Sequence, residues 1–541
     1  MRAPYSRNLI DLVCEQAERY PAHAAVIADG QRFTYADLAE RAGRVAGALR
    51  QAGIGRGDRI AMLVNNRVEW IDICLGAAAL GAVAVPFSTW STQREIDFLL
   101  GDSGARLLFT LERFGDREYA ADLTALLEQG ATRYPRLESI VLVGGGTMAG
   151  ARDFDSFLKA PSASVEAPSA PVESIAPGER ARAGDIAFIL YTSGSTAYPK
   201  AVPNLHGAAI ENGFHIGERQ GLVPGDRVFL PMPLFWSYGS ANAMCATFTH
   251  GATLVLQGRF DAAEALDLIE AYACTAIYTL PAITAALTGH AAFTPGRTRS
   301  LRTAMTIGTP QDIASVANVL GAREVCNIYG QTESYGNCCV TWHHWPLERR
   351  MHSQGPPLPG VTLRIVEPES GRALPAGEVG LIEVAGYLTP GYAGASASQN
   401  AAAFTTDGYF RTGDLGLVDT DGNLEFKARD SEMIKRGGIN IAPAEVEEVL
   451  RQHPHVAAAG VAGAPHPDKG EIIVAFVVPA RGCTVNGEEL RSHCRKLAAT
   501  YKTPDRIEIR DALPVTTTGK LLRRELKEMA AALQSVEGET A

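Results

Sequence analysis

The sequence predicts an α/β protein whose large N-terminal domain is built from βαβ layers around a parallel sheet. Short apolar runs that suit buried strands alternate with longer runs of helical period, which is typical of βαβ units. The chain has 541 residues, 46% of them hydrophobic, so it can form large cores and more than one domain. Near Arg429 a polar stretch gives way to a new compact pattern, which predicts a second, small α+β domain.

The N-terminal elements follow one another in the order expected of such layers. Asp29-Gly30, between two apolar runs, is a signal for a two-residue hairpin. Thr34 can cap the next helix, because its hydroxyl can accept a hydrogen bond from a first-turn N–H. The expected elements are strands over 24–27, 32–35, 59–64, 82–85 and 186–190, and helices over 38–49 and 69–80.

The rest of the chain divides at the polar, charged stretch 422–430. Residues 161–185 are rich in Pro, Ala and Ser, which indicates a surface connection. We therefore predict two domains, residues 1–428 and residues 429–541. The expected elements of the second domain are a helix over 444–452, a strand over 472–478 and a helix over 487–499.

Charge and cysteine usage exclude several classes of protein. The chain has 50 Lys and Arg against 60 Asp and Glu, a net charge of −10, which argues against a nucleic-acid binder. Its nine cysteines lack metal-ligand spacing, so we expect reduced thiols in a cytoplasmic protein without structural zinc. The N-terminus lacks the pattern of a secretory signal, and the longest apolar run, 73–87, is too short to span a bilayer.

One stretch, 191–202, reads YTSGSTAYPKAV and follows the apolar run 186–190. A glycine in such a turn lets consecutive backbone N–H groups point into one concavity, which suits a phosphate. The hydroxyls around it add O–H donors, and Lys200 adds a positive charge for a polyphosphate. The spacing is not that of a P-loop, and taken alone the stretch also fits a solvated Ser/Thr turn.

Four further motifs follow in the chain: IYGQTES at 328–334, GYFRTGDLG at 408–416, KRGGINIAPAEVE at 435–447 and PVTTTGKLL at 514–522. The ordered set of five resembles the adenylate-forming superfamily of acyl-CoA synthetases, aryl-CoA ligases, firefly luciferase and peptide-synthetase adenylation domains. The resemblance implies a large N-terminal domain with a β subdomain and a mobile C-terminal lid hinged at Ser431. It also implies an enzyme that converts a carboxylic acid and ATP to an acyl-adenylate and pyrophosphate, and then forms an acyl-CoA thioester. The implied cofactors are ATP, Mg²⁺ and CoA. The oligomeric state stays open, with a homodimer as one possibility.

The resemblance assigns residues to each part of the nucleotide. Thr332 and Glu333 suit the α-phosphate and Mg²⁺, and Asp414 suits the two ribose hydroxyls, with Arg429 as a second ribose contact. Lys520 is implied to reach into the active site and stabilise the charge that develops between the acid and the α-phosphate. The remaining residues implied to bind nucleotide are Thr192, Ser193, Gly194, Ser195, Thr196 and Lys200 at the β- and γ-phosphates, Tyr329, Gly330 and Gln331 at the adenine, and Lys435 on the lid. The residues implied to approach CoA are Gly437 and Gly438.

Four positions depart from the pattern of the family. Ala197 and Ala201 stand where glycine is preferred, so an added Cβ restricts positive φ and can reshape the phosphate loop. Ser431 stands at the hinge where Asp or Lys is usual. Trp236, in PLFWSYG, replaces a histidine at the mouth of the acyl pocket, and it cannot hold the amine of an α-amino acid.

The resemblance also places a mixed aromatic and polar set around the acid. Its members are Trp236, Tyr238, Ser240, Asn242, Gly308, Thr309, Gly330, Gly336 and Cys338. This set favours a cyclic, aromatic or medium-chain acid over a long alkyl chain. Two alternatives stay open: an enzyme that passes its adenylate to a carrier-protein thiol, an amine or another nucleophile, and a nucleotide-binding homologue with degenerate catalysis.

Overall fold

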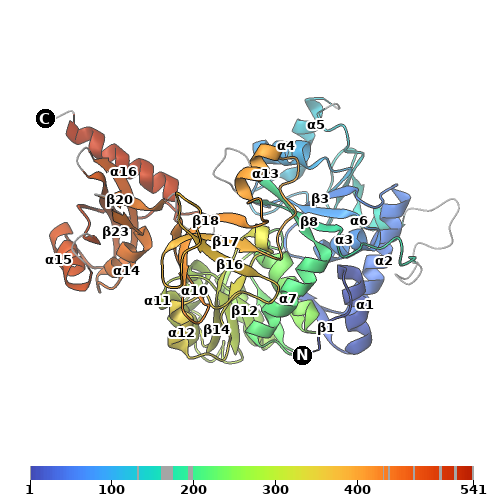
Figure 1. The fold of residues 1–541 in the computed structure, drawn as a ribbon. Helices are drawn as coiled ribbons and strands as arrows, with labels where there is room; N and C mark the ends of the chain where they lie inside the picture. The colour runs from blue at the N-terminus through green and yellow to red at the C-terminus, as the bar shows by residue number, and fades with distance from the viewer. Residues whose placement is uncertain are drawn as a thin grey trace. The chain divides into compact units, whose positions relative to one another are not determined.

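The computed structural model describes residues 2–130, 133–159, 175–192, 199–429, 432–436, 439–466, 469–498, 502–516 and 521–538 (Figure 1). The chain forms two compact units. The first comprises Met1–Thr362 and Val384–Phe410, and the second comprises Leu363–Glu383 and Arg411–Ala541. The predicted hinge at Ser431 lies outside the described residues, and the predicted division at residue 429 stays a prediction.

The first unit contains two large, mostly parallel sheets, which confirms the predicted α/β class. One sheet has eight strands, with antiparallel pairs only at its two ends, β1–β2 and β14–β15. Its order is β15 (Cys339–Val340), β14 (Glu324–Tyr329), β13 (Thr303–Thr306), β12 (Ala276–Tyr278), β10 (Arg227–Leu230), β11 (Thr253–Leu256), β1 (Ala24–Ala28) and β2 (Gln31–Thr34).

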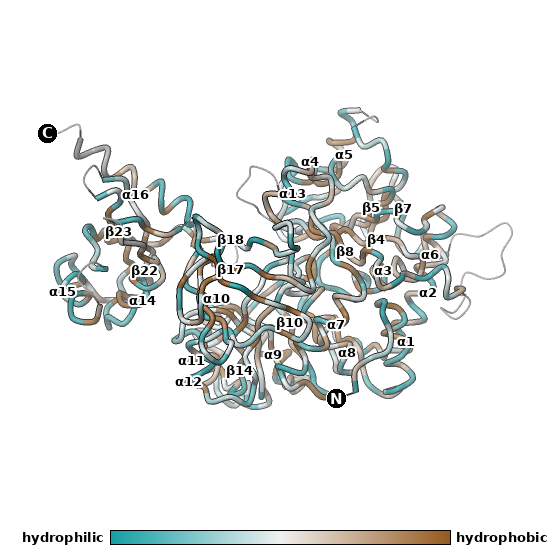
Figure 2. The backbone as a smooth tube through the Cα atoms, in the orientation of Figure 1, coloured by the Kyte–Doolittle hydropathy of each residue, from teal (hydrophilic) through white to brown (hydrophobic). Residues whose placement is uncertain are grey.

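The other sheet of this unit has seven strands, all parallel except for the last pair, β8–β9. Its order is β7 (Arg152–Asp153), β6 (Ser139–Leu142), β5 (Leu107–Thr110), β3 (Arg59–Leu63), β4 (Val83–Pro86), β8 (Ile186–Thr192) and β9 (Lys200–Leu205). The central strands β3, β4 and β5 are almost wholly buried and hydrophobic along their length, as expected of parallel strands covered on both faces (Figure 2).

Helices cover these sheets, and Figure 1 shows them between successive strands. They are α1 (Leu9–Arg19), α2 (Tyr35–Gln51), α3 (Val68–Ala79), α4 (Gln93–Ser103), α5 (Tyr119–Glu128), α6 (Phe154–Lys159), α7 (His206–Gln220), α8 (Cys245–Thr249), α9 (Ala262–Ala271), α10 (Pro281–Thr288), α11 (Pro310–Asn318), α12 (Leu347–His352) and α13 (Ala397–Ala403), with a π-helix η2 (Tyr238–Met244) and a 3₁₀ turn η3 (Thr332–Ser334). In the part of the chain that the structure describes, no helix is both long enough and apolar enough to cross a membrane.

The local signals near the N-terminus act as predicted. Asp29 and Gly30 both have positive φ, 49° and 76°, as a two-residue hairpin between β1 and β2 requires. The Thr34 side chain accepts a hydrogen bond from the Asp37 amide and forms a capping box at the start of α2. The strand predicted over 32–35 ends one residue early, because this cap makes Tyr35 the first residue of the helix.

The second unit carries the predicted small α+β body, and it also carries the β subdomain, which was expected in the N-terminal domain. The β subdomain is a four-stranded sheet of β16 (Thr362–Val366), β17 (Gly380–Ala385), β18 (Phe410–Val418) and β19 (Leu424–Arg429). The α+β body has strands β21 (Ile439–Ile441), β20 (Ile434–Arg436), β23 (Gly470–Pro479), β22 (Val456–His466) and β24 (Arg506–Ile509), and helices α14 (Pro443–Arg451), α15 (Gly487–Leu497) and α16 (Arg523–Gly538). Two apolar clusters hold this body together: α14 and α15 pack on one side of β22 and β23, and α16 packs on the other.

Candidate active site

The antiparallel strands β8 and β9 flank the phosphate-loop stretch. Residues 187–190 of β8 are buried, in agreement with the predicted buried strand. Thr192, the last residue of β8, and Lys200, the first residue of β9, are cross-strand partners. Ser193, Gly194, Ser195 and Thr196, which join these two residues, lie outside the described residues.

Ala201 departs from the family pattern without a cost to the backbone. It lies within β9, pairs with Tyr191 and is buried. Its carbonyl accepts a hydrogen bond of 2.9 Å from the Ala393 amide. Because Ala201 is not among the described residues with positive φ, a Cβ is compatible with the backbone at this position. Ala197 lies outside the described residues.

The motif at 328–334 places a buried carboxylate after the end of a strand. β14 ends at Tyr329, and the single 3₁₀ turn η3 follows it. Tyr335 ends this turn in the left-handed region, with φ 59°. Glu333 is only 6% exposed, and its backbone carbonyl accepts a hydrogen bond of 2.8 Å from Thr389. A carboxylate at such depth needs a partner.

Tyr392 is that partner, and it also contacts Lys200. Its phenol donates a hydrogen bond of 2.9 Å to Oε1 of Glu333. The Lys200 Nζ lies 4.7 Å from the centroid of the same ring, within the range of a cation–π contact. One aromatic side chain therefore holds the lysine and the glutamate that the motifs assign to the phosphates and to the metal.

Thr332 is held from two other elements. Its hydroxyl lies 3.0 Å from the Ser237 hydroxyl, and its carbonyl accepts a hydrogen bond of 3.2 Å from the buried Asn204 on β9. Thr332 therefore joins three parts of the chain: strand β9, the 3₁₀ turn and the segment that precedes η2.

Trp236 immediately precedes this segment and is half-buried against a second indole. The rings of Trp236 and Trp90 meet edge to face, with centroids 5.2 Å apart and planes at 82°. Trp90 meets Phe235 in the same way at 5.2 Å. The Trp236 carbonyl accepts hydrogen bonds from the Ser240 amide and hydroxyl, at 2.9 and 3.0 Å. Trp236 is thus fixed by both its ring and its backbone.

The glycines of the acyl set lie where other atoms approach closely. A Cβ on Gly330 would lie 2.5 Å from the Asn337 Cα, and one on Gly308 would lie 2.7 Å from the Asp312 side chain. Gly336 has φ +93°, and a Cβ there would lie 3.3 Å from the Asn242 amide nitrogen. Two other members of the set have structural partners: the Thr309 hydroxyl caps α11 through Asp312, and the buried Cys338 amide bonds the Tyr329 carbonyl at 2.8 Å.

The ribose residues come together within the second unit. Asp414 on β18 and Arg429 on β19 are cross-strand partners, and Arg429 Nε lies 2.8 Å from Asp414 Oδ1. The Asp414 side chain is 5% exposed and that of Arg429 50%. Thr412 fixes the backbone at Asp414. Its hydroxyl accepts a hydrogen bond from the Asp414 amide and donates one to the Ile382 carbonyl.

The lid residues are only partly described. Lys435 lies exposed on β20, and its amide donates a hydrogen bond of 2.7 Å to Glu471. Gly437, Gly438 and Lys520 lie outside the described residues.

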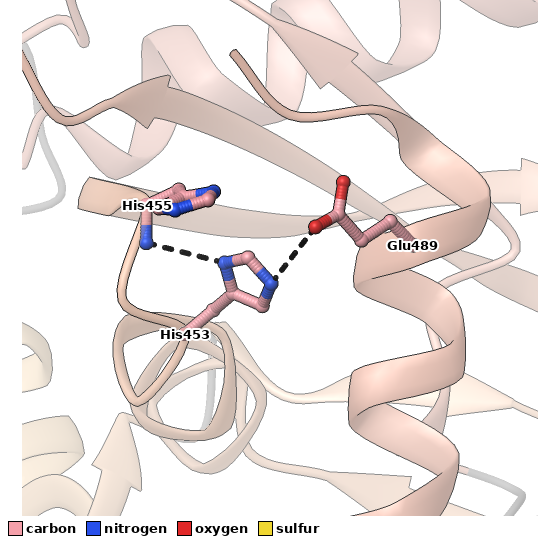
Figure 3. Close-up of side chains that lie close together, drawn as sticks. All are labelled: His453, His455 and Glu489. Atoms are coloured by element: carbon pink, nitrogen blue, oxygen red, sulfur yellow. Dashed lines mark hydrogen bonds and ion pairs between the residues drawn. The ribbon is translucent and has the colours of Figure 1, made fainter. Parts of the chain in front are cut away.

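A second polar cluster, His453, His455 and Glu489, lies in the α+β body (Figure 3). The His453 Nδ1 accepts from the His455 amide at 3.3 Å, so the ring proton is on Nε2, which lies 3.3 Å from a Glu489 oxygen. A metal at Nε2 would displace this proton to Nδ1, where it would oppose the His455 N–H. We therefore assign the cluster a structural role in fastening the turn after α14 to α15.

Sequence reasoning missed Tyr392, Trp90, Ser237 and Asn204. Ser237 lies in PLFWSYG but was given no role there, and the other three residues lie outside the quoted motifs. The contacts of Tyr392 and Trp90 with the site join residues far apart in the chain, and no local pattern reports such pairs.

This fold, with Lys200 and a buried glutamate held on one tyrosine ring, is the arrangement of an adenylate-forming enzyme. The chain belongs to the family of AMP-binding enzymes: residues 13–393 match the AMP-binding enzyme domain, and residues 445–520 match the AMP-binding enzyme C-terminal domain. This confirms the resemblance drawn from the five motifs and the predicted class, an AMP-forming acid–thiol ligase that uses ATP and CoA.

Several relatives match almost the whole chain. A feruloyl-CoA synthase of an Amycolatopsis species is 32% identical over 515 residues, 95% of this chain and 97% of the relative. The fatty acid–[acyl-carrier-protein] ligase ScoC of Streptomyces coeruleorubidus is 32% identical over 548 residues, 97% of each chain. Among solved structures, the anthranilate CoA ligase AuaEII in complex with anthranoyl-AMP has a TM-score of 0.85 and 26% identity, with 99% of this chain and 100% of that chain covered.

Proposed function

We propose that the protein activates a cyclic, aromatic or medium-chain carboxylic acid with ATP and transfers the acyl group to CoA. The observation that carries the proposal is the bridge by Tyr392 between Lys200 and Glu333, a cation and an anion held on one ring beside the phosphate loop. In the first half-reaction a carboxylate oxygen attacks the α-phosphorus and pyrophosphate leaves. In the second, the CoA thiolate attacks the acyl carbon and AMP leaves.

The first unit supplies the groups for the phosphates. Thr192 and Lys200, with Ser193 to Thr196 between them, hold the β- and γ-phosphates, and Thr332 holds the α-phosphate. Glu333 is the ligand for Mg²⁺, whose preference for carboxylate and hydroxyl oxygens fits the pair Thr332 and Glu333. When bound, Mg²⁺ would neutralise charge on the phosphates. Tyr392 keeps Glu333 oriented, because its phenol fixes one carboxylate oxygen.

Two groups of residues are proposed to bind the nucleoside. Tyr329, Gly330 and Gln331 line the adenine. Asp414 accepts hydrogen bonds from the two ribose hydroxyls, and its contact with Arg429 orients the buried carboxylate.

The C-terminal domain, residues 429–541, acts as the lid and turns at Ser431. Lys520 neutralises the charge that develops between the acid and the α-phosphate, and Lys435 contacts the adenylate. Gly437 and Gly438 leave room for the pantetheine arm of CoA. A lysine on a mobile domain can be withdrawn after the first half-reaction.

A second candidate is transfer of the acyl-adenylate to a carrier-protein thiol. The similarity to a fatty acid–[acyl-carrier-protein] ligase over 97% of the chain supports this candidate as well. The two candidates share the first half-reaction and differ only in the acceptor.

A panel of carboxylic acids, assayed for pyrophosphate with and without CoA, separates these functions. The proposal predicts acid-dependent pyrophosphate release and a CoA thioester in the product. Release of pyrophosphate without consumption of CoA would favour another acceptor, and the absence of release with every acid would contradict both candidates.

Two further proposals concern the location of the enzyme in the cell and its oligomeric state. All nine cysteines are free thiols, which supports a cytoplasmic location. A homodimer stays a prediction, and light scattering on the purified protein tests it.

A further inference from the structure

Three aromatic rings, those of Trp90, Phe235 and Trp236, meet at nearly right angles. The Trp90 ring lies 5.2 Å from the Phe235 ring with the planes at 85°, and 5.2 Å from the Trp236 ring with the planes at 82°. The rings of Phe235 and Trp236 are 6.2 Å apart, and their planes meet at 81°. Each pair therefore has the edge-to-face geometry that aromatic rings favour.

Trp90 is the member of this group that comes from a distant part of the chain. It lies in the loop between β4 and α4, whereas Phe235 and Trp236 are neighbours in the sequence. Phe235 is buried and Trp236 is half-buried, while Trp90 is 37% exposed. All three residues belong to the first unit. Trp90 thus packs against the partly exposed Trp236 ring from a separate segment.

The loop that carries Trp90 is fixed on both sides of that residue. The Trp90 amide donates a hydrogen bond of 3.1 Å to the Ser88 hydroxyl. The carbonyl of the buried Thr89 accepts a hydrogen bond from the Tyr119 phenol, which comes from α5. Thr92 begins α4 with a capping box. The backbone therefore gives the Trp90 ring a rigid base.

The backbone near Trp236 is also fixed, by a buried asparagine. The Asn66 Nδ2 donates to the Met232 carbonyl at 2.8 Å, and its Oδ1 accepts from the Leu234 amide at 2.8 Å. With the Trp236 carbonyl held by Ser240, the freedom that remains at Trp236 is rotation of the indole about its side-chain bonds. The edge-to-face contact with Trp90 restricts this rotation.

We propose that Trp90 is a positioning residue for the acid, because it holds the Trp236 indole in one orientation and so makes the enzyme distinguish a flat ring from a saturated one. This rests on the proposed function, which puts Trp236 at the mouth of the acyl pocket, and it narrows the acid to an aromatic one. An indole in a fixed orientation offers a constant flat face, on which a planar ring packs more closely than a puckered ring. An indole that rotates adapts to both.

Two pairs of acids that differ only in the saturation of the ring test this inference. They are benzoate with cyclohexanecarboxylate, and 3-phenylpropionate with 3-cyclohexylpropionate. The measurement is the ratio of kcat/KM for the aromatic acid to that for its saturated partner, from pyrophosphate release. For the wild type we expect at least one pair to favour the aromatic acid by roughly 3- to 10-fold, the range of one edge-to-face contact.

Trp90→Ala should bring this ratio close to one and leave the KM for ATP unchanged. Trp90→Leu, which keeps more of the packing volume, should do the same. Trp90→Phe retains a ring at this position and should keep the ratio within about twofold of the wild type. A residue that only stabilises the fold would lower the melting temperature in Trp90→Ala without a change in the ratio.

A double-mutant cycle shows whether Trp90 acts through Trp236. If it does, Trp90→Ala should leave the ratio unchanged when Trp236→Ala is already present. The matched control is Trp345→Ala, because the described contact of that indole is with the Arg349 guanidinium, 4.0 Å from the ring centroid. This control should leave the ratio as it is in the wild type.

The other outcomes separate the inference from the proposed function. Equal ratios in the wild type and in Trp90→Ala, or equal effects of Trp90→Ala with and without Trp236→Ala, would overturn the inference. A wild type that accepts linear acids but no member of either pair, or that favours neither aromatic acid, would overturn it as well. Each of these results leaves the proposed function intact. A wild type that releases pyrophosphate with no acid of a wider panel would instead remove the proposed function.

Discussion

The Tyr392 phenol donates a hydrogen bond of 2.9 Å to Glu333, and the two residues are 59 positions apart in the chain. The same ring contacts Lys200. Because a buried carboxylate with one fixed oxygen presents the other in a defined direction, Tyr392 acts as a positioning residue for the metal and phosphate groups.

Tyr392→Phe should therefore lower kcat/KM for ATP by roughly 10- to 100-fold, since a hydrogen bond to a charged group is typically worth about 1.5–3 kcal/mol. The variant keeps the ring and its contact with Lys200. Because Glu333 is the proposed ligand for Mg²⁺, the loss of activity should be accompanied by a higher Mg²⁺ requirement. Steady-state kinetics over a range of Mg²⁺ concentrations measure both effects. Tyr387→Phe, whose hydroxyl bonds Glu211 at 3.5 Å, is the control. Equal kinetics for both variants would show that Tyr392 does not position Glu333.

Asp414→Ala should weaken ATP binding more than it weakens binding of the acid. The buried carboxylate is assigned to the ribose, and its removal leaves two hydroxyls and Arg429 without their partner. Calorimetric titration with a non-hydrolysable ATP analogue and with the acid provides both affinities. An unchanged nucleotide affinity would remove Asp414 from the site.

Lys520→Ala should abolish adenylation while a preformed acyl-adenylate still forms the thioester. One charged contact of this kind is typically worth about 3 kcal/mol in the transition state, and Lys520 is assigned to the first half-reaction alone. Single-turnover assays that start from ATP or from the purified adenylate separate the two steps. An equal fall in both would contradict the assignment to the lid.

Trp236→His and Trp236→Ala should reorder the preferences among acids and penalise cyclic and aromatic acids most. Trp236 presents a flat ring held edge to face by Trp90, whereas the nucleotide contacts lie on other loops. The ratios of kcat/KM across the panel are the measurement, with the KM for ATP as the internal control. A uniform fall across all acids would make Trp236 a scaffold residue.

Acidification should destabilise the protein through His206. Burial lowers the pKa of His206 to about 4, whereas an unfolded histidine titrates near 6.5. The unfolded state therefore binds a proton between these values and the folded state does not, so stability falls as the pH falls from about 6.5 to 4, by up to about 3 kcal/mol. Urea unfolding at pH 7.5 and 5 should show a smaller difference for His206→Asn than for the wild type. An equal difference would show that His206 does not carry this dependence.

Local chemistry accounts for what the sequence predicted well. The Asp29-Gly30 turn and the Thr34 cap depend on neighbouring residues only, and the strand before the phosphate loop is a plain apolar run. Thr309 was predicted only as a member of the acyl set, although Thr309 and Asp312 also have the spacing of a capping box, which the structure contains. The partners of Glu333 and Trp236 could not be predicted from the sequence, because each contact joins segments that only the folded chain brings together.

Exchange of labelled pyrophosphate into ATP, in the absence of CoA, tests the central claim most directly. If the enzyme forms an acyl-adenylate at the Lys200, Tyr392 and Glu333 group, exchange should require the carboxylic acid and fall at least tenfold in Glu333→Gln. Exchange that proceeds equally without acid, or that is unaffected by Glu333→Gln, would contradict the account.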